Sequence, residues 1–186
     1  MSGKNTAVYG IFRDTVALGG GLEALRTAGF RGTDISVLMP ENVGTKDFVH
    51  KKDTKAPEGA TTGVASGAVI GGALGWLAGI GALAIPGLGP FIAAGPIMGL
   101  LAGAGAGGAV GGIAGALIGM GIPEYEAKRY EGRVKSGGIL VSVHCDSSEW
   151  VKRAKTVLDQ TGAEEIATAG EATADYAMSD RPASRI

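Results

Sequence analysis

Two rows of glycines at four-residue spacing constrain the fold of this chain more than any other feature. Five of these glycines lie between Gly63 and Gly79, and seven lie between Gly95 and Gly119. Glycine inside a helix costs about 1 kcal/mol relative to alanine, so helix propensity does not explain the spacing. Small residues at every fourth position let helices approach closely where solvent supplies no hydrophobic driving force, as in lipid. The rows therefore predict glycine-zipper helices that pack against other helices.

A long charge-free segment contains both rows. From Gly59 to Pro123 the chain has no Asp, Glu, Lys, Arg or His. We expect helices over Thr61–Ile85 and Ile97–Gly121, each about 37 Å long at about 1.5 Å per residue. Three prolines in Pro86–Pro96 break the helix between them, so the segment is predicted to be a helical hairpin. Either helix is long enough to cross a hydrocarbon core of about 30 Å.

Two environments suit this hairpin. It lies in or on a membrane, or it is buried in a soluble assembly in which many copies share the burial of the apolar surface. A flexible linker fits less well, because such linkers are polar and Ser-rich, whereas this segment carries Val, Ile, Leu and Trp. Both interpretations predict a homo-oligomer. Of the two environments, we expect membrane lipid. Its predicted helix-packing interface consists of Gly63, Gly67, Gly71, Gly75, Gly79, Gly99, Gly103, Gly107, Gly111, Gly115 and Gly119.

Basic residues flank the charge-free segment on both sides. Four lysines precede it between Lys46 and Lys55, and a second basic group follows it between Lys128 and Lys135. The positive-inside rule then places both flanks and both termini in the cytoplasm, at a bacterial inner membrane. The first twelve residues contain no long apolar run, so we do not expect a secretory signal peptide.

The flanks show the pattern of an ordinary α+β domain. Without the insert, the expected order is β-α-β, a charged helix, and β-α-β, which is the split βαβ pattern of a ferredoxin-like sandwich with one added helix. Residues 1–58 and 123–170 are expected to form this domain, 59–122 the hairpin, and 171–186 a disordered tail. The expected strands are Ala7–Phe12, Asp34–Met39, Ile139–His144 and Glu165–Ala169, and the expected helices are Val16–Ala28, Glu124–Ser136 and one from Ser147 or Ser148 to Thr161.

The chain offers no pattern that indicates catalysis. His144 and Cys145 are adjacent at a strand end, and zinc needs three or four ligands, so no metal site is predicted. The run Gly19–Gly21 lacks both the GxGxxG order and a Walker lysine, so no cofactor site is predicted. A net charge of −1 and the lack of a basic stripe give no reason to expect nucleic acid. We therefore expect a protein that is not an enzyme.

Two stretches of the sequence carry a family resemblance. The first contains VYGIFRD, LEALRTAGF and DISVLMPE, and the second contains IPGLGPFIAAGP and GIPEYEAKRYEGRVKSGGILVSVHC. Together, over about 7–170, they resemble the bacterial general stress (heat-induced stress) proteins, whose ferredoxin-like domain is often interrupted by a glycine-rich hydrophobic hairpin. The resemblance implies a stress context and supplies no catalytic residues.

The expected function is a structural one under stress: self-assembly through the hairpin to shape or seal a membrane or to form a compartment. The layout is also similar to the small subunit of the quinol:electron-acceptor oxidoreductase, which anchors a soluble domain with two membrane helices. An accessory anchor subunit is therefore one alternative, and a soluble module that binds a small ligand is another. The strict glycine period favours self-assembly, because an anchor that contacts large and varied partners does not need it.

Overall fold

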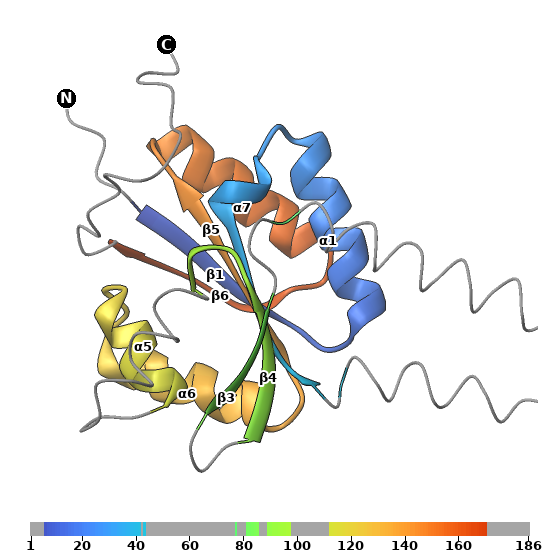
Figure 1. Ribbon diagram of the computed structural model, residues 1–186. Coiled ribbons are helices and arrows are strands. Elements are labelled where there is room, and N and C mark those ends of the chain that lie inside the picture. Colours follow the sequence, from blue (N-terminus) through green and yellow to red (C-terminus); the bar gives the residue numbers. More distant parts are fainter. Residues whose placement is uncertain are drawn as a thin grey trace, which may run out of the picture.

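The computed structural model describes residues 6–41, 43, 77, 81–85, 89–97 and 112–170. These residues form a mixed α+β fold with one antiparallel sheet of six strands in the order β3-β4-β2-β5-β1-β6 (Figure 1). The strands are β1 (Thr6–Phe12), β2 (Ile35–Pro40), β3 (Gly81–Ile85), β4 (Gly89–Ala94), β5 (Ile139–Cys145) and β6 (Glu164–Gly170). The α-helices are α1 (Thr15–Thr27), α5 (Ile113–Gly119), α6 (Glu124–Lys135) and α7 (Ser148–Gln160).

Helices cover both faces of the sheet. Helices α1 and α7 lie together on one face, and α5 and α6 lie on the other (Figure 1). The residues between α1 or α7 and the sheet, here called the α1/α7 core, include Phe12, Leu22 and Val141. The α5/α6 core lies on the opposite face and includes Leu38 and Leu117. Because successive residues of a strand point to opposite faces, each central strand contributes to both cores.

Local signals in the flanks set the helix ends as expected. Asp14 caps α1, since its Oδ1 accepts hydrogen bonds from the backbone N–H groups of Val16 and Ala17 at 3.0 and 2.8 Å. Gly29, with φ of +95°, follows the last turn of α1, where a left-handed residue commonly ends a helix. Inside α1, a Cβ on Gly21 would lie 2.4 Å from the Phe12 ring, so this glycine makes room for the aromatic side chain.

The strands and helices predicted for the flanks are confirmed to within one or two residues. One difference lies before β2, where Asp34 belongs to a 3₁₀ turn, Gly32–Asp34, and the strand begins at Ile35. The Asp34 carboxylate accepts hydrogen bonds from the side chain of Arg31, Nε to Oδ2 at 3.0 Å and Nη2 to Oδ1 at 3.0 Å. These bonds raise the pKa of Arg31.

The helix predicted over Thr61–Ile85 is wrong at its C-terminal end. Gly81–Ile85 is strand β3, and most of the expected break between the helices is strand β4. Strand β4 pairs with β2, with Val37 opposite Ala94 and Pro40 opposite Phe91. Short apolar runs between glycines and prolines fit a buried strand as well as a helix, and here the outer side of β2 supplies the pairing partner. The turn expected at the far end of a hairpin is therefore part of the sheet.

The predicted helix over Ile97–Gly121 is also wrong as one continuous element. Gly112 has φ of +116° and ψ near 180°, so a right-handed helix does not pass through it. Helix α5 begins after this residue and has only seven residues. The division of the chain into 1–58 plus 123–170 and 59–122 remains a prediction, and the expected tail, 171–186, lies outside the described residues.

Candidate functional site

The structure describes two of the eleven predicted interface glycines, and both lie in α5. Gly115 is half-buried, and Gly119 is exposed at the last turn of the helix. No heavy atom lies within 4 Å of a Cβ added to Gly119, so nothing in the described chain packs into the space that its missing side chain leaves. Ile118, beside it, is 38% exposed. The outer side of α5 is therefore an open surface of small and apolar residues.

The other predicted interface glycines lie outside the described residues. This group consists of the whole first row and the four glycines of the second row between Ile97 and α5: Gly63, Gly67, Gly71, Gly75, Gly79, Gly99, Gly103, Gly107 and Gly111.

Gly95 belongs to the same four-residue row but has a different role. It follows β4 with φ of +77°, a backbone conformation that residues with side chains rarely adopt. A Cβ at this position would lie 2.1 Å from the carbonyl oxygen of Ile35 and 2.9 Å from the Cα of Ser36. The backbone N–H of Ile97 then donates a hydrogen bond to Ser36 Oγ at 3.2 Å. Gly95 therefore lets the chain cross closely over β2 within its own domain.

Helix α5 is attached to α6 by a hydrogen bond from its first turn. The backbone N–H of Ala114 donates to Glu131 Oε2 at 2.8 Å, and Glu131 also pairs with Lys135 one turn later on α6. The four N-terminal N–H groups of a helix lack partners within it, so this carboxylate acts as a cap supplied by another helix. The sequence shows only the Glu131–Lys135 spacing of four, which predicts a pair on α6 and gives no sign of the contact with α5.

An arginine–glutamate cluster connects α6 to the start of β6. Glu164 pairs with Arg13 and Arg133, and Glu165 pairs with Arg129 and Arg133, whose Nε atoms lie 3.0 and 3.1 Å from its carboxylate oxygens. The sequence pattern does not predict the contacts of α6 with β6, because Glu164 and Glu165 lie about 30 residues further along the chain.

Tyr130 anchors the same helix from inside. Its side chain is fully buried, and its hydroxyl donates a hydrogen bond to the backbone carbonyl of Glu165 at 2.7 Å. Burial disfavours the charged phenolate and, with the nearby Glu126 carboxylate, raises the pKa of Tyr130 to about 12. The Tyr9 ring lies 6.2 Å away, centroid to centroid. This buried pair of rings fixes α6 on the sheet.

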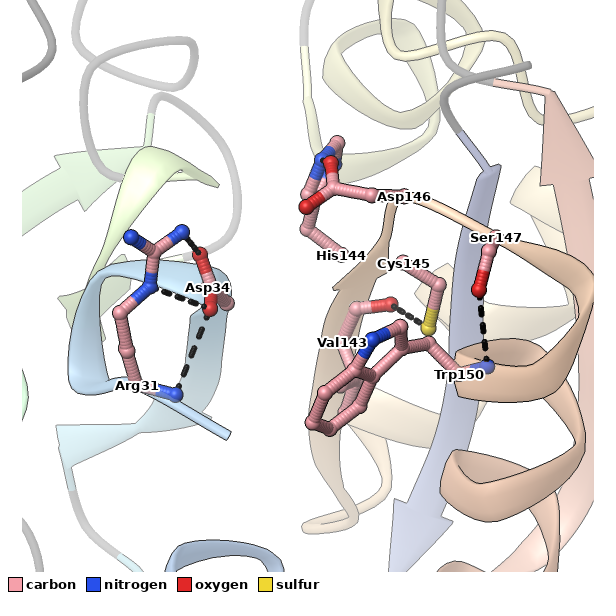
Figure 2. A network of polar contacts seen from close by, with 8 residues as sticks. All are labelled: Arg31, Asp34, Val143, His144, Cys145, Asp146, Ser147 and Trp150. Atoms are coloured by element: carbon pink, nitrogen blue, oxygen red, sulfur yellow. Dashed lines mark hydrogen bonds and ion pairs between the residues drawn. The ribbon is translucent and has the colours of Figure 1, made fainter. Parts of the chain in front are cut away.

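The adjacent His144 and Cys145 do not form a common site. They lie at the end of β5, where Cys145 belongs to the α1/α7 core and its neighbour points to the other face. His144 Nε2 lies 2.8 Å from Asp146 Oδ1. Cys145 is 1% exposed, and its thiol donates to the Val143 carbonyl at 3.5 Å, on the side of Trp150 (Figure 2). The side chains therefore belong to separate environments.

The described residues give no direct sign of a cofactor site. Over these parts of the chain, no three His, Cys, Asp or Glu side chains come together as metal ligands would. Among the helices formed by the described residues, none is both long and apolar enough to cross a bilayer.

Comparisons of the chain with protein-family models, with curated protein sequences and with solved structures give no match. The resemblance to general stress proteins therefore remains a prediction from the sequence motifs, and the candidate site rests on the residues of this chain alone.

Proposed function

We propose that this chain is a non-enzymatic protein that assembles with copies of itself through its glycine-periodic apolar segments, with a ferredoxin-like domain as the rigid part of each subunit. The observation that carries the proposal is a charge-free stretch of the chain in which glycines recur at every fourth position. Such spacing allows close backbone approach between helices. The resemblance to general stress proteins suggests that the assembly acts during stress, at a membrane or as a compartment.

The arrangement of the flanks supports the ferredoxin-like part of this proposal. Four of the six strands come from the flanks and lie in the order β2-β5-β1-β6. Helix α1 follows β1 and α7 connects β5 to β6, and both lie on the same face of the sheet (Figure 1). In a split βαβ sandwich, a strand of one βαβ half lies between the two strands of the other half.

The two glycine rows occupy defined positions between the elements of the fold. The first row lies between β2 and β3, and the second lies largely between Ile97 and α5. Each segment is therefore joined at both ends to described residues of the fold. Because β4 pairs with β2, a hairpin with residues 89–94 on the far side of a bilayer is incompatible with this sheet. We accordingly propose that the glycine rows pack between subunits, with lipid at the apolar surface of the assembly.

Particle mass tests this proposal. Gly71→Leu and Gly107→Leu each add a bulky side chain to one of the two rows, and Gly132→Leu is the matched control. Gly132 is exposed on α6, and no heavy atom lies within 4 Å of a Cβ added there. Light scattering with and without detergent should give a wild-type mass several times the 18.5 kDa of one chain.

We expect both row variants to fall to a dimer or monomer while keeping the circular dichroism of the wild type. The Gly132→Leu control should keep the full mass. A wild-type monomer in both conditions, or full assembly of both row variants, would contradict the proposal.

A further inference from the structure

Strand β6 forms one outer edge of the sheet. It pairs with β1 on one side, from Ala167 opposite Tyr9 to Gly170 opposite Thr6, and no described strand pairs with its other side. Thr168 and Gly170 are exposed (Figure 1 shows β6 at the margin of the sheet). The backbone N–H and C=O groups along such an edge are a template for a further strand.

This edge lacks the usual protection against pairing. Proteins commonly place Lys, Pro or a bulge on an exposed edge strand. Residues 166–170 read Ile-Ala-Thr-Ala-Gly and contain neither a charge nor a proline. The irregular part of β6 is confined to its start, where Glu165 has φ of +53° and the register with β1 shifts. The regular part of the strand is therefore open to a partner.

We propose that β6 pairs antiparallel with β6 of a second copy, about a two-fold axis at Thr168. This residue is the middle of 166–170, so Thr168 lies opposite itself and Ala167 lies opposite Ala169. Thr–Thr pairs across an antiparallel ladder are favourable, and the small alanines beside them do not hinder the approach. A contact of this kind uses the same patch on both subunits and closes into a dimer. It does not depend on the glycine segments.

The residues of the edge favour a second copy over an unrelated peptide. About an axis at Thr168, Ile166 lies opposite Gly170, so the largest side chain of 166–170 meets the smallest. The arginine–glutamate cluster at the start of β6 has three arginines and two glutamates. An antiparallel two-fold pair places the two clusters at opposite ends of the ladder, so like charges do not face one another.

Disulfide cross-linking of the full chain tests the two-fold axis. Opposite residues of an antiparallel pair have Cα atoms about 4.5–5.5 Å apart, which suits a disulfide with its usual Cα separation of about 4.4–6.8 Å. We expect Thr168→Cys to form more than half covalent dimer under mild oxidation with diamide. Thr156→Cys, exposed on α7, and the wild type, whose Cys145 is buried, should form less than a tenth. Equal yields for Thr168→Cys and Thr156→Cys would overturn the proposal.

A charge swap provides a second test that does not require oxidation. Thr168→Lys and Thr168→Glu each place like charges opposite one another, so each alone should weaken the contact at least tenfold. A mixture of the two variants should restore pairing, measured as energy transfer between differently labelled chains. Failure of the mixture to pair more tightly than either variant alone would contradict a two-fold at this residue.

The contact can be separated from the glycine rows. Thr168→Cys in a Gly107→Leu chain should cross-link to the same yield, whatever the mass of the assembly. A yield that falls to that of the Thr156→Cys control would overturn an independent β6 contact. If Thr168→Cys cross-links only in a chain truncated after Gly170, then residues 171–186 of the same chain block the edge in the full chain. That result would also overturn the proposal.

Discussion

The two faces of the sheet carry hydrophobic cores of different origin. The α1/α7 core is built mainly from the flanks, and the charge-free insert adds only Leu77, Ala94 and the half-buried Ile92 among the described residues. The α5/α6 core takes a large share of its side chains from the insert, namely Phe91, Ala93, Ile97, Ile113, Ala114, Ala116, Leu117, Met120 and Ile122. The comparison shows that the described part of the insert packs into both cores of the domain and supplies much of one of them.

Deletion of the whole insert should have the largest effect on stability, because it removes much of the α5/α6 core. Deletion of 59–122 removes β3, β4 and α5, and each large buried side chain contributes about 2 kcal/mol. The α5/α6 core alone loses six such side chains, and this loss approaches the whole stability of a domain, which is about 5–15 kcal/mol. We expect the deleted chain to lose cooperative thermal unfolding, measured by circular dichroism.

The control replaces only 98–111 with a Gly/Ser segment of equal length, which leaves every described residue in place. This chain should unfold cooperatively. A deletion of 59–122 that still melted as cooperatively as the wild type would show that the α5/α6 core does not need the insert.

A matched pair of core substitutions sharpens the comparison. Leu117 comes from the insert and is 0% exposed, and Leu22 comes from a flank and is 1% exposed. Because both side chains are fully buried, Leu117→Ala and Leu22→Ala should each lower the free energy of unfolding by about 2–5 kcal/mol. Urea denaturation measures both values. A cost below about 1 kcal/mol for Leu117→Ala alone would mean that α5 does not pack on the sheet as described.

Two glycines of one row should respond differently to the same change. Gly95→Ala places a Cβ 2.1 Å from the Ile35 carbonyl oxygen at φ of +77°, and should cost about 2–3 kcal/mol. Gly119→Ala meets open space in a helix, and should be neutral or stabilise by up to about 1 kcal/mol. Thermal melts distinguish the two outcomes, and similar effects at both positions would indicate that the row acts as one unit.

The smallest expected effect is a pH dependence on the α5/α6 side. The folded-state pKa of Tyr130 is raised to about 12, above the ordinary value of about 10, because the phenol is buried. The unfolded chain then releases this proton first, so stability is complete below about pH 10 and falls as the pH rises toward 12. Tyr130→Phe should flatten this fall in urea melts at pH 9–12. An unchanged slope would show that Tyr130 ionises normally.

The flanks were predictable because each element carries its own local signals. The Asp14 cap, the positive-φ Gly29 and the proline at the end of β2 all act within a few residues. The insert was not, because Gly81–Ile85 pairs with β4, and β4 in turn pairs with β2, which lies about 50 residues earlier in the chain. Gly95 also falls in the four-residue period, but it is a glycine because a Cβ there would collide with the carbonyl oxygen of Ile35.

The candidate site was predictable only as a pattern. The glycine spacing predicts close packing of some kind, but no local feature says whether the partner belongs to the same chain or to another. The contacts that the sequence did not predict, Ala114 with Glu131 and Arg13 with Glu164, join residues far apart in the chain. Such contacts become visible only when the fold brings the elements together.

Hydrogen exchange of the intact protein tests most directly whether the insert belongs to the sheet. Strand β4 lies between β3 and β2, so its amides are hydrogen-bonded inside the ladder. We predict that residues 91–94 exchange as slowly as the amides of β5, with protection close to the global free energy of unfolding. Exchange of residues 91–94 at the rate of an unprotected peptide, while β5 stays protected, would contradict the account.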